Sequence, residues 1–405
     1  MERIFRKLLL IAVMLTTIIG IIFTQSSPVK SQLSDILSFK KMVLADGKAG
    51  DLFGHSVAIK ANYGLVGAPF KDTEGIDSGA AYLWNLTTGK QLAKLIPPGL
   101  QSGDKLGFAV AFNFNLALVT APYDDVNGQD TGAAYLFSLK DISEKPKQFL
   151  VSSLKSGDLF GYAVAMNNKY AIISAAYKDA EGVDSGVVYV FDLNTGEQLH
   201  KLTPNDANAG DLFGYTVAIG DNYALIGAPY KDEKGIDSGA VYKFDLISGQ
   251  QLMKITPNDG STGDLFGFSV GVDGDYGLVS AGYDDLNGTD SGSVYLYNLS
   301  TGKKLQKFEP SSTQAGDVFG HSVAMSRKYT IIGAGYQDAQ ALDTGAAYLL
   351  NDGTLTKLMP SNPEARSVFG HSVAINEDFA LISAPYTDEQ GVDSGVVYIL
   401  DLSQL

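Results

Sequence analysis

One short stretch returns seven times along this chain of 405 residues, and it constrains the fold more than any other feature. In its first copy, residues 50–59, it reads GDLFGHSVAI. Successive copies lie 50–54 residues apart, with the second glycine of each at Gly54, Gly107, Gly161, Gly214, Gly267, Gly320 and Gly370. A fixed period of this size indicates a solenoid, a propeller or a linear array built from copies of one unit.

Each copy opens a repeat that predicts four short strands. In the first repeat we expect them at 55–60, 63–68, 80–86 and 91–96, joined by a short turn, a longer polar loop and a second turn. The first two strands lack a clean alternation of apolar and polar residues, which is typical of strands covered on both faces. Small residues in the inner strands and aromatic residues in the third suit a blade that widens away from an axis.

The two ends of the chain predict how the repeats are arranged. The last repeat stops near Leu402, after its third strand, while the segment Phe39–Met42 precedes the first repeat and aligns with Leu92–Leu95 in its fourth strand. We therefore expect the N-terminal strand to complete the last blade, which closes a ring and removes open sheet edges. The predicted fold is all-β, a seven-bladed β-propeller of four-stranded blades, because an open solenoid would instead carry capping repeats.

The domain organisation that follows is a signal peptide or N-terminal membrane anchor at 1–31 and a propeller at 32–405. Its repeats start near 50, 103, 157, 210, 263, 316 and 366. Basic residues precede an uncharged run at 8–23, which is short for a spanning helix and typical of a signal peptide. Cleavage before Gln32 and an uncleaved anchor are the two alternatives. Both place the propeller outside the cytoplasm, whether secreted, periplasmic or at the cell surface.

Composition narrows the partners. The formal net charge is −15, which argues against nucleic acid because phosphate binding needs a basic face. Cations or basic surfaces are more natural partners. The chain has no cysteine, which excludes disulfides, thiolate metal sites and a lipoprotein anchor. We expect a monomer.

Three elements of the repeat resemble the FG-GAP repeats of the integrin alpha-subunit N-terminal propeller. In the first repeat they are Phe53-Gly54, Gly67-Ala68-Pro69 and Gly79-Ala80-Ala81-Tyr82, and the fourth repeat carries them as Phe213-Gly214, Gly227-Ala228-Pro229 and Gly239-Ala240-Val241-Tyr242. The resemblance covers residues 39–405, although Leu106 replaces the phenylalanine in repeat two, and repeats five and six lack the proline. It implies a secreted or cell-surface binding module, often involved in adhesion or protein contacts.

Several members of that family carry a calcium loop of the type Asp-x-Asp-x-Asp-Gly between the Phe-Gly and Gly-Ala-Pro elements. Here that interval is a short turn such as Lys60–Tyr63. The nearest approach, Asp273-Gly274-Asp275, offers too few oxygens for an ion that takes six to eight ligands. The family's calcium sites are therefore not carried over to this chain.

The most polar recurring feature is the loop between the second and third strands. It holds two aspartates in all seven repeats, and a third aspartate precedes the Phe-Gly element in six of them. Both sets should emerge on one strongly negative face, where the aspartates either shape turns by accepting backbone N–H bonds or bind a hard cation such as calcium. The metal candidates lie in repeats two and five, where the loops add an asparagine: Asp125, Asn127, Asp130, Asp285, Asn287 and Asp290.

Three of the four histidines, His55, His321 and His371, follow the Phe-Gly glycine in blades that become neighbours once the ring closes. A three-histidine metal site is one interpretation. A ring of packed aromatic-sized side chains is favoured over it, because Phe or Tyr fills this position in the other repeats. No Ser-His-Asp set or carboxylate pair stands out from the repeats, so no active site is predicted.

We therefore predict a non-enzymatic, extracytoplasmic binding or adhesion module whose acidic loop face contacts a protein or glycan at the cell surface, with calcium as the cofactor to test. One alternative is a carbohydrate-binding propeller, whose aromatic contacts would come from Phe70, Tyr123, Tyr177, Tyr230, Tyr283, Tyr336 and Tyr386 unless these pack between blades. A hydrolase or lyase is the other, and it predicts one blade with loops unlike the rest. The longer connection at 140–153 is the one irregularity that a partner could use.

Overall fold

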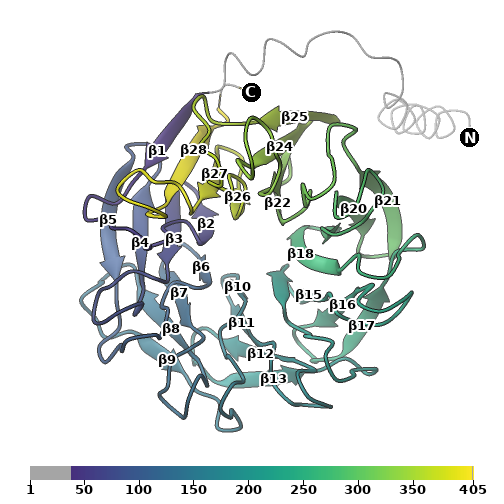
Figure 1. The fold of residues 1–405 in the computed structure, drawn as a ribbon. Coiled ribbons are helices and arrows are strands. Elements are labelled where there is room, and N and C mark those ends of the chain that lie inside the picture. Colours follow the sequence, from purple (N-terminus) through teal and green to yellow (C-terminus); the bar gives the residue numbers. More distant parts are fainter. Residues whose placement is uncertain (1–37, 404) are drawn as a thin grey trace, which may run out of the picture.

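Seven four-stranded antiparallel sheets are arranged as blades around a central axis (Figure 1). The computed structural model describes residues 38–403 and residue 405, so that the segment at 1–31, predicted as a signal peptide or anchor, lies outside the described residues. The seven-bladed, all-β propeller predicted from the repeats is confirmed. None of the residues described forms a helix long and apolar enough to cross a membrane.

Each blade begins with the strand nearest the axis and ends with the strand at the rim. Blades one to four comprise β2 (Ser56–Lys60), β3 (Tyr63–Ala68), β4 (Ala80–Asn85) and β5 (Lys90–Leu95); β6 (Val110–Phe112), β7 (Leu116–Ala121), β8 (Ala133–Ser138) and β9 (Lys147–Phe149); β10 (Val164–Met166), β11 (Tyr170–Ala175), β12 (Val187–Asp192) and β13 (Gln198–Leu202); β14 (Thr216–Ile219), β15 (Tyr223–Ala228), β16 (Ala240–Asp245) and β17 (Gln251–Ile255). Blades five to seven comprise β18 (Phe266–Asp273), β19 (Tyr276–Ala281), β20 (Ser293–Asn298) and β21 (Lys303–Phe308); β22 (Ser322–Met325), β23 (Tyr329–Ala334), β24 (Ala346–Asn351) and β25 (Thr354–Leu358); β26 (Val373–Ile375), β27 (Phe379–Ala384), β28 (Val396–Asp401) and, from the N-terminus, β1 (Phe39–Met42).

The ring closes through the N-terminal strand. β1 pairs antiparallel with β28, placing Lys40 opposite Ile399 and Met42 opposite Val397. Figure 1 shows this strand, in purple, beside the yellow C-terminal strands. The segment that seemed unassigned in the sequence therefore supplies the rim strand of blade seven, as its alignment predicts.

The core lies between the blades. Seven clusters of buried residues each join two neighbouring blades, and the cluster between blades seven and one brings Val397 and Ile399 against Val66 and Tyr82. Second strands are consequently buried on both faces, as along the whole of β11. Full burial of one large apolar side chain stabilises by about 1.5–3 kcal/mol, and here that stabilisation is distributed among all seven interfaces between blades.

Neighbouring blades approach most closely where the Gly-Ala-Pro and Phe-Gly elements meet. A Cβ atom on Gly67 would lie 1.9 Å from the carbonyl oxygen of Gly107 in the next blade. The same contact recurs at Gly227 and Gly333, where the distances would be 2.1 and 2.0 Å. The two elements that recur together in the sequence are thus the two sides of one inter-blade contact.

The connections between strands define two faces. The loops between second and third strands lie against the segment carrying the Phe-Gly element of the next blade, since the N–H groups of Gly103 and Leu106 donate to the carbonyl oxygens of Ile76 and Ser78. We call this side the loop face, and the prediction that both sets of loops share it is confirmed. The opposite side, the turn face, carries the turns between first and second strands and the connections between third and fourth strands.

Candidate binding surfaces

One aspartate pair closes each loop between the second and third strands. The Oδ1 atom of the first aspartate accepts the backbone N–H of the second, which has φ between 51° and 57°, a conformation that Asp and Asn tolerate better than most residues. The pairs are Asp72–Asp77, Asp125–Asp130, Asp179–Asp184, Asp232–Asp237, Asp285–Asp290, Asp338–Asp343 and Asp388–Asp393. The turn-forming role, one of the two interpretations of these residues, is therefore present in every blade.

The six metal candidates lie in two blades that are not neighbours, so they do not form one site. Asp125 and Asp285 each accept the turn hydrogen bond at 2.8 Å. The Asn287 side chain donates to the carbonyl oxygen of Pro310 at 3.3 Å and to Thr313 at 3.2 Å. Within the described part of the chain, no group of three or more His, Asp and Glu side chains is placed to hold a metal ion. Calcium binding by these residues stays a prediction.

The third recurring aspartate is buried in an ion pair, and the sequence alone did not single out its partner. The Lys71 ammonium lies 2.8 Å from Asp51 and also donates to the carbonyl oxygen of Asp46 at 2.5 Å, with both charged side chains only 3% exposed. Lys178 with Asp158, at 2.6 Å, and Lys231 with Asp211, at 3.0 Å, repeat the pair in blades three and four. A lysine 20 residues after the aspartate is the signal that could have revealed it.

Blades two and five hold an acid at the position where blades one, three and four hold that lysine. In blade two, burial and the neighbouring charge of Asp124 raise the pKa of Asp104 to about 6, and Tyr135 donates to Asp124 at 2.6 Å. In blade five, Lys307 from the rim strand lies 2.9 Å from Asp284. Gln148 pairs with Tyr135 in blade two as Lys307 pairs with Tyr295 in blade five, so blade two lacks this lysine. In blade five, burial still raises the pKa of the equivalent aspartate, Asp264, to about 6.

The side chains that follow the Phe-Gly glycine form a closed aromatic ring around the axis. Neighbouring ring centroids lie 4.9–5.7 Å apart, in the order His55, Phe108, Tyr162, Tyr215, Phe268, His321 and His371. Burial lowers the pKa of His55 and His321 to about 4, so that both are neutral at pH 7. The packed ring favoured over a three-histidine metal site is what the geometry shows.

A second set of aromatic side chains lies outside this ring on the loop face. Tyr123 packs against Phe108 at 6.1 Å between centroids, and Tyr177 packs edge-on against Tyr162 at 5.4 Å. Tyr336 is 37% exposed, and the equivalent residues of the other blades are partly buried. These residues therefore pack against the inner ring and still show part of their surface to solvent.

Every blade also exposes one aliphatic side chain in its aspartate loop, a feature that the sequence analysis missed. Each of these side chains is at least half exposed: Ile76, Val126, Val183, Ile236, Leu286, Leu342 and Val392. In five blades the aliphatic residue directly precedes the second aspartate, and in blades two and five it directly follows the first. The loop face thus presents a ring of seven apolar contacts, each flanked by a carboxylate.

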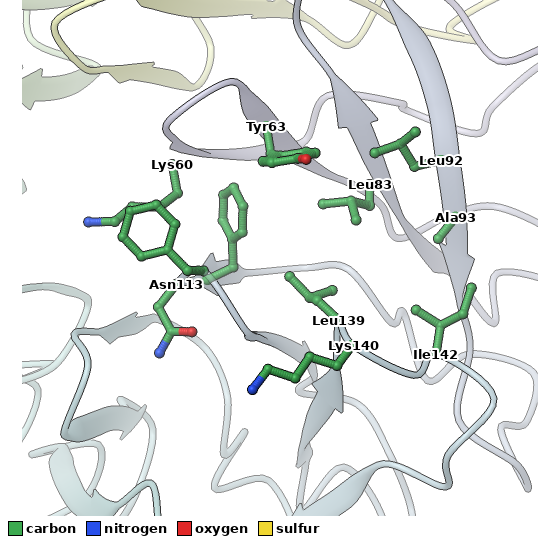
Figure 2. A pocket seen from close by; sticks show the side chains of 11 residues that line it. Lys60, Tyr63, Leu83, Leu92, Ala93, Asn113, Leu139, Lys140 and Ile142 are labelled. Carbon is green, nitrogen blue, oxygen red and sulfur yellow. The ribbon is translucent and has the colours of Figure 1, made fainter.

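The turn face carries a cleft between blades one and two (Figure 2). Its volume is about 340 Å³, within the range usual for ligand pockets. Blade one lines it with Lys60, Tyr63 and Leu83, and blade two with Phe114 and with the connection between β8 and β9. None of the eleven lining residues is acidic, although the chain as a whole is strongly so.

Two departures from the repeat build this cleft. Residues 139–146 connect β8 to β9, whereas residues 86–89 make the equivalent connection in blade one. Phe114, two residues before its second strand, is 63% exposed. The equivalent residues in the other blades are Ala61, Asn168, Asp221, Gly274, Arg327 and Glu377. The long connection that was predicted as irregular at 140–153 therefore borders this cleft, through Lys140 and Ile142.

Comparison with known proteins bears on the family. The family model of the FG-GAP repeat matches the chain seven times, as many times as there are blades. The matched residues are 38–84, 90–137, 151–191, 197–244, 250–297, 303–350 and 353–400. No curated protein matches the chain. Because the matches cover most of the sequence and the structure is a closed seven-bladed propeller, the chain belongs to the FG-GAP repeat family.

Proposed function

We propose that this protein is a non-catalytic, extracytoplasmic binding scaffold that makes adhesion-type contacts through its loop face. The observation that carries the proposal is the ring of seven exposed aliphatic side chains beside the aspartates. Exposed apolar groups rimmed by charge are typical of protein contact sites. FG-GAP propellers are binding and adhesion scaffolds, which agrees with this use of the surface.

Repetition also supports binding over catalysis. A partner that meets several equivalent contacts gains from avidity, because each further contact forms within an already joined complex. Among the described residues, the only hydrogen bond made by the side chain of a ring histidine joins His321 to a backbone group, the carbonyl oxygen of His371, at 3.0 Å. Among the described residues, no histidine of this ring is oriented by a carboxylate beside a nucleophile, the arrangement that triad-type nucleophilic catalysis requires.

The test is binding of purified residues 32–405, labelled with a fluorophore, to cells of the source organism. We expect saturable binding that is abolished when the cells are first treated with a protease, because the partner is a protein. Binding that survives proteolysis and reappears on a glycan array would replace this proposal with the carbohydrate-binding alternative, in which the half-exposed tyrosines of the loop face stack on sugar rings. Absence of binding to cells and glycans would contradict both.

Calcium dependence is examined in the same assay. If Asp125, Asp130, Asp285 and Asp290 hold calcium, a chelator should weaken cell binding, and Asp125→Asn with Asp285→Asn should remove that sensitivity. The matched substitutions Asp179→Asn with Asp232→Asn change the same turn positions in blades three and four, where the loops lack the added asparagine. Equal behaviour of the two double variants would show that the aspartates serve the turns alone.

A further inference from the structure

We propose that the cleft between blades one and two binds a segment of a partner protein in which an aromatic or aliphatic side chain is flanked by carboxylates. This site is on the turn face and is separate from the loop face, so this proposal does not depend on the function proposed above. Three observations define the occupant: the shape of the cleft, its charge and the apolar surface around it.

The cleft is large enough for one apolar side chain and its neighbours. Leu83, Phe112 and Leu139 line it, and its volume is about 340 Å³. In Figure 2, Tyr63 and Leu83 of blade one lie across from Leu139 and Lys140 of blade two, so that both blades contribute a wall. Burying an apolar side chain there removes surface on both partners from water.

The apolar surface continues beyond the cleft, which favours a peptide chain over a small molecule. Phe114 is 63% exposed, and Leu92 and Ile142 are each 49% exposed. A ligand confined to the cleft would leave these side chains in water, whereas an extended segment would cover them. Exposed apolar residues scattered singly are normal, but here they border one concavity.

The charge of the cleft selects for carboxylates. The two lysines in the lining, Lys60 and Lys140, make no ion pair within the described residues, and Lys60 lies 5.2 Å from the centre of the Phe114 ring. The nearest acid on the connection, Asp141, is engaged in its own turn, where it accepts from Ser143 at 2.6 Å. The ammonium groups are thus available to a partner, beside the apolar surface that would bury its side chain.

The test measures binding of three blocked tripeptides by ligand-observed fluorine NMR: acetyl-Asp-X-Asp-amide, acetyl-Asn-X-Asn-amide and acetyl-Lys-X-Lys-amide, where X is 4-fluorophenylalanine. Exposed ion pairs are each worth about 0.5 kcal/mol, so two of them should make the acidic peptide bind about fivefold tighter than the neutral one at low salt. The basic peptide should bind weakest. Absence of binding by every peptide, or equal affinity of acidic and neutral peptides, would overturn the proposal.

Variants taken from the repeat itself locate the site. Phe114→Asn introduces the residue that blade three has at this position, Asn168, and should reduce binding of the acidic peptide at least fivefold. Lys60→Gln with Lys140→Gln should lower its affinity to that of the neutral peptide. The matched controls are Ile247→Asn, at an exposed residue of blade four, and Lys169→Gln with Lys328→Gln, at turn-face lysines of other blades.

Controls that weaken binding as much as the cleft variants would place the peptide elsewhere and overturn the assignment. Melting temperatures of all variants should agree with that of the wild type, because the replaced side chains are exposed or border the open cleft. Sedimentation velocity supplies the remaining outcome. Self-association that Phe114→Asn abolishes would identify a second copy of this chain as the occupant and contradict a foreign partner.

Discussion

The buried aspartates before the Phe-Gly element should respond to one substitution with opposite signs in two blades. Asp51→Asn removes the carboxylate that lies 2.8 Å from Lys71, leaving the ammonium buried without its counter-charge. Removing one partner of a buried ion pair costs about 3–5 kcal/mol. Asparagine still has an oxygen for the N–H of Lys48, which Asp51 accepts at 2.7 Å, so the loss comes from the charge.

Asp104→Asn removes a carboxylate that lies beside a second acid instead of a lysine. Its pKa of about 6, against an ordinary 3.8, means that folding favours the protonated form. The ionised form therefore lowers the free energy of unfolding, by up to about 3 kcal/mol at neutral pH. The sign follows from the raised pKa: the stabilisation is present below pH 3.8 and is lost as the pH rises through 6. Asp104→Asn should accordingly stabilise the protein by about 1–3 kcal/mol at pH 7.5 and have little effect at pH 4.

Calorimetry of residues 32–405 measures both effects. An unfolding entropy of about 2.1 cal/mol/K per residue over roughly 370 residues means that 1 kcal/mol moves Tm by about 1.3 °C. Asp51→Asn should lower Tm by about 4–6 °C and Asp104→Asn should raise it by about 1–4 °C at pH 7.5. Asp158→Asn, which breaks the pair with Lys178, should match Asp51→Asn. A loss of stability in Asp104→Asn comparable to that in Asp51→Asn would refute the reasoning, because the carboxylate would then be stabilising in both blades.

Three further outcomes are expected. A chain that begins at Asp46 lacks β1, including the fully buried Met42. It should melt at a lower temperature and should associate through the exposed edge of β28, which size-exclusion chromatography would detect. A stable monomer would contradict ring closure by β1. His321→Phe should lose less stability than the wild type as the pH falls from 6.5 to 4, because it removes one of the buried ring histidines whose lowered pKa opposes protonation in the folded state. A Tm-against-pH curve identical to that of the wild type would count against this prediction. With a chelator present, Asp125→Ala and Asp179→Ala should each lower the free energy of unfolding by about 1 kcal/mol, because both lose the same turn hydrogen bond. A further loss of stability in Asp125→Ala, seen only when calcium is present, would identify a metal site.

The fold was predictable because the repeat fixes local structure and closure together. Phe39–Met42 has the pattern of a rim strand and lies at the same distance before its Phe-Gly element as the first rim strand lies before the next, so its place in blade seven followed from alignment alone. The strands of the first repeat were predicted to within one residue at each end.

The buried pairs and the surfaces were harder to predict, because they depend on what the fold brings together. The aspartates that looked like candidate ligands are divided between exposed turns, such as Asp72, and buried positions, such as Asp51. In the sequence, only the lysine 20 residues after Asp51, Asp158 and Asp211 hints at the difference. The exposed aliphatic residues resemble core residues in sequence, and only burial shows that Ile76 lies in water. The connection at 140–153 was recognised as irregular in the sequence. The cleft that it forms with Lys60 could not be predicted, because Lys60 lies in the neighbouring blade.

The most direct test of the central claim, that the loop face is the binding surface, is cell binding by a loop-face variant. Ile76→Ser, Val183→Ser, Ile236→Ser and Val392→Ser remove four side chains that are 63–72% exposed, and should leave Tm unchanged. Ile247→Ser, Leu252→Ser and Leu305→Ser, at residues 46–62% exposed outside the aspartate loops, form the control. The loop-face variant should lose binding at least tenfold, while the control should bind as the wild type does. Wild-type binding by the loop-face variant would contradict that claim.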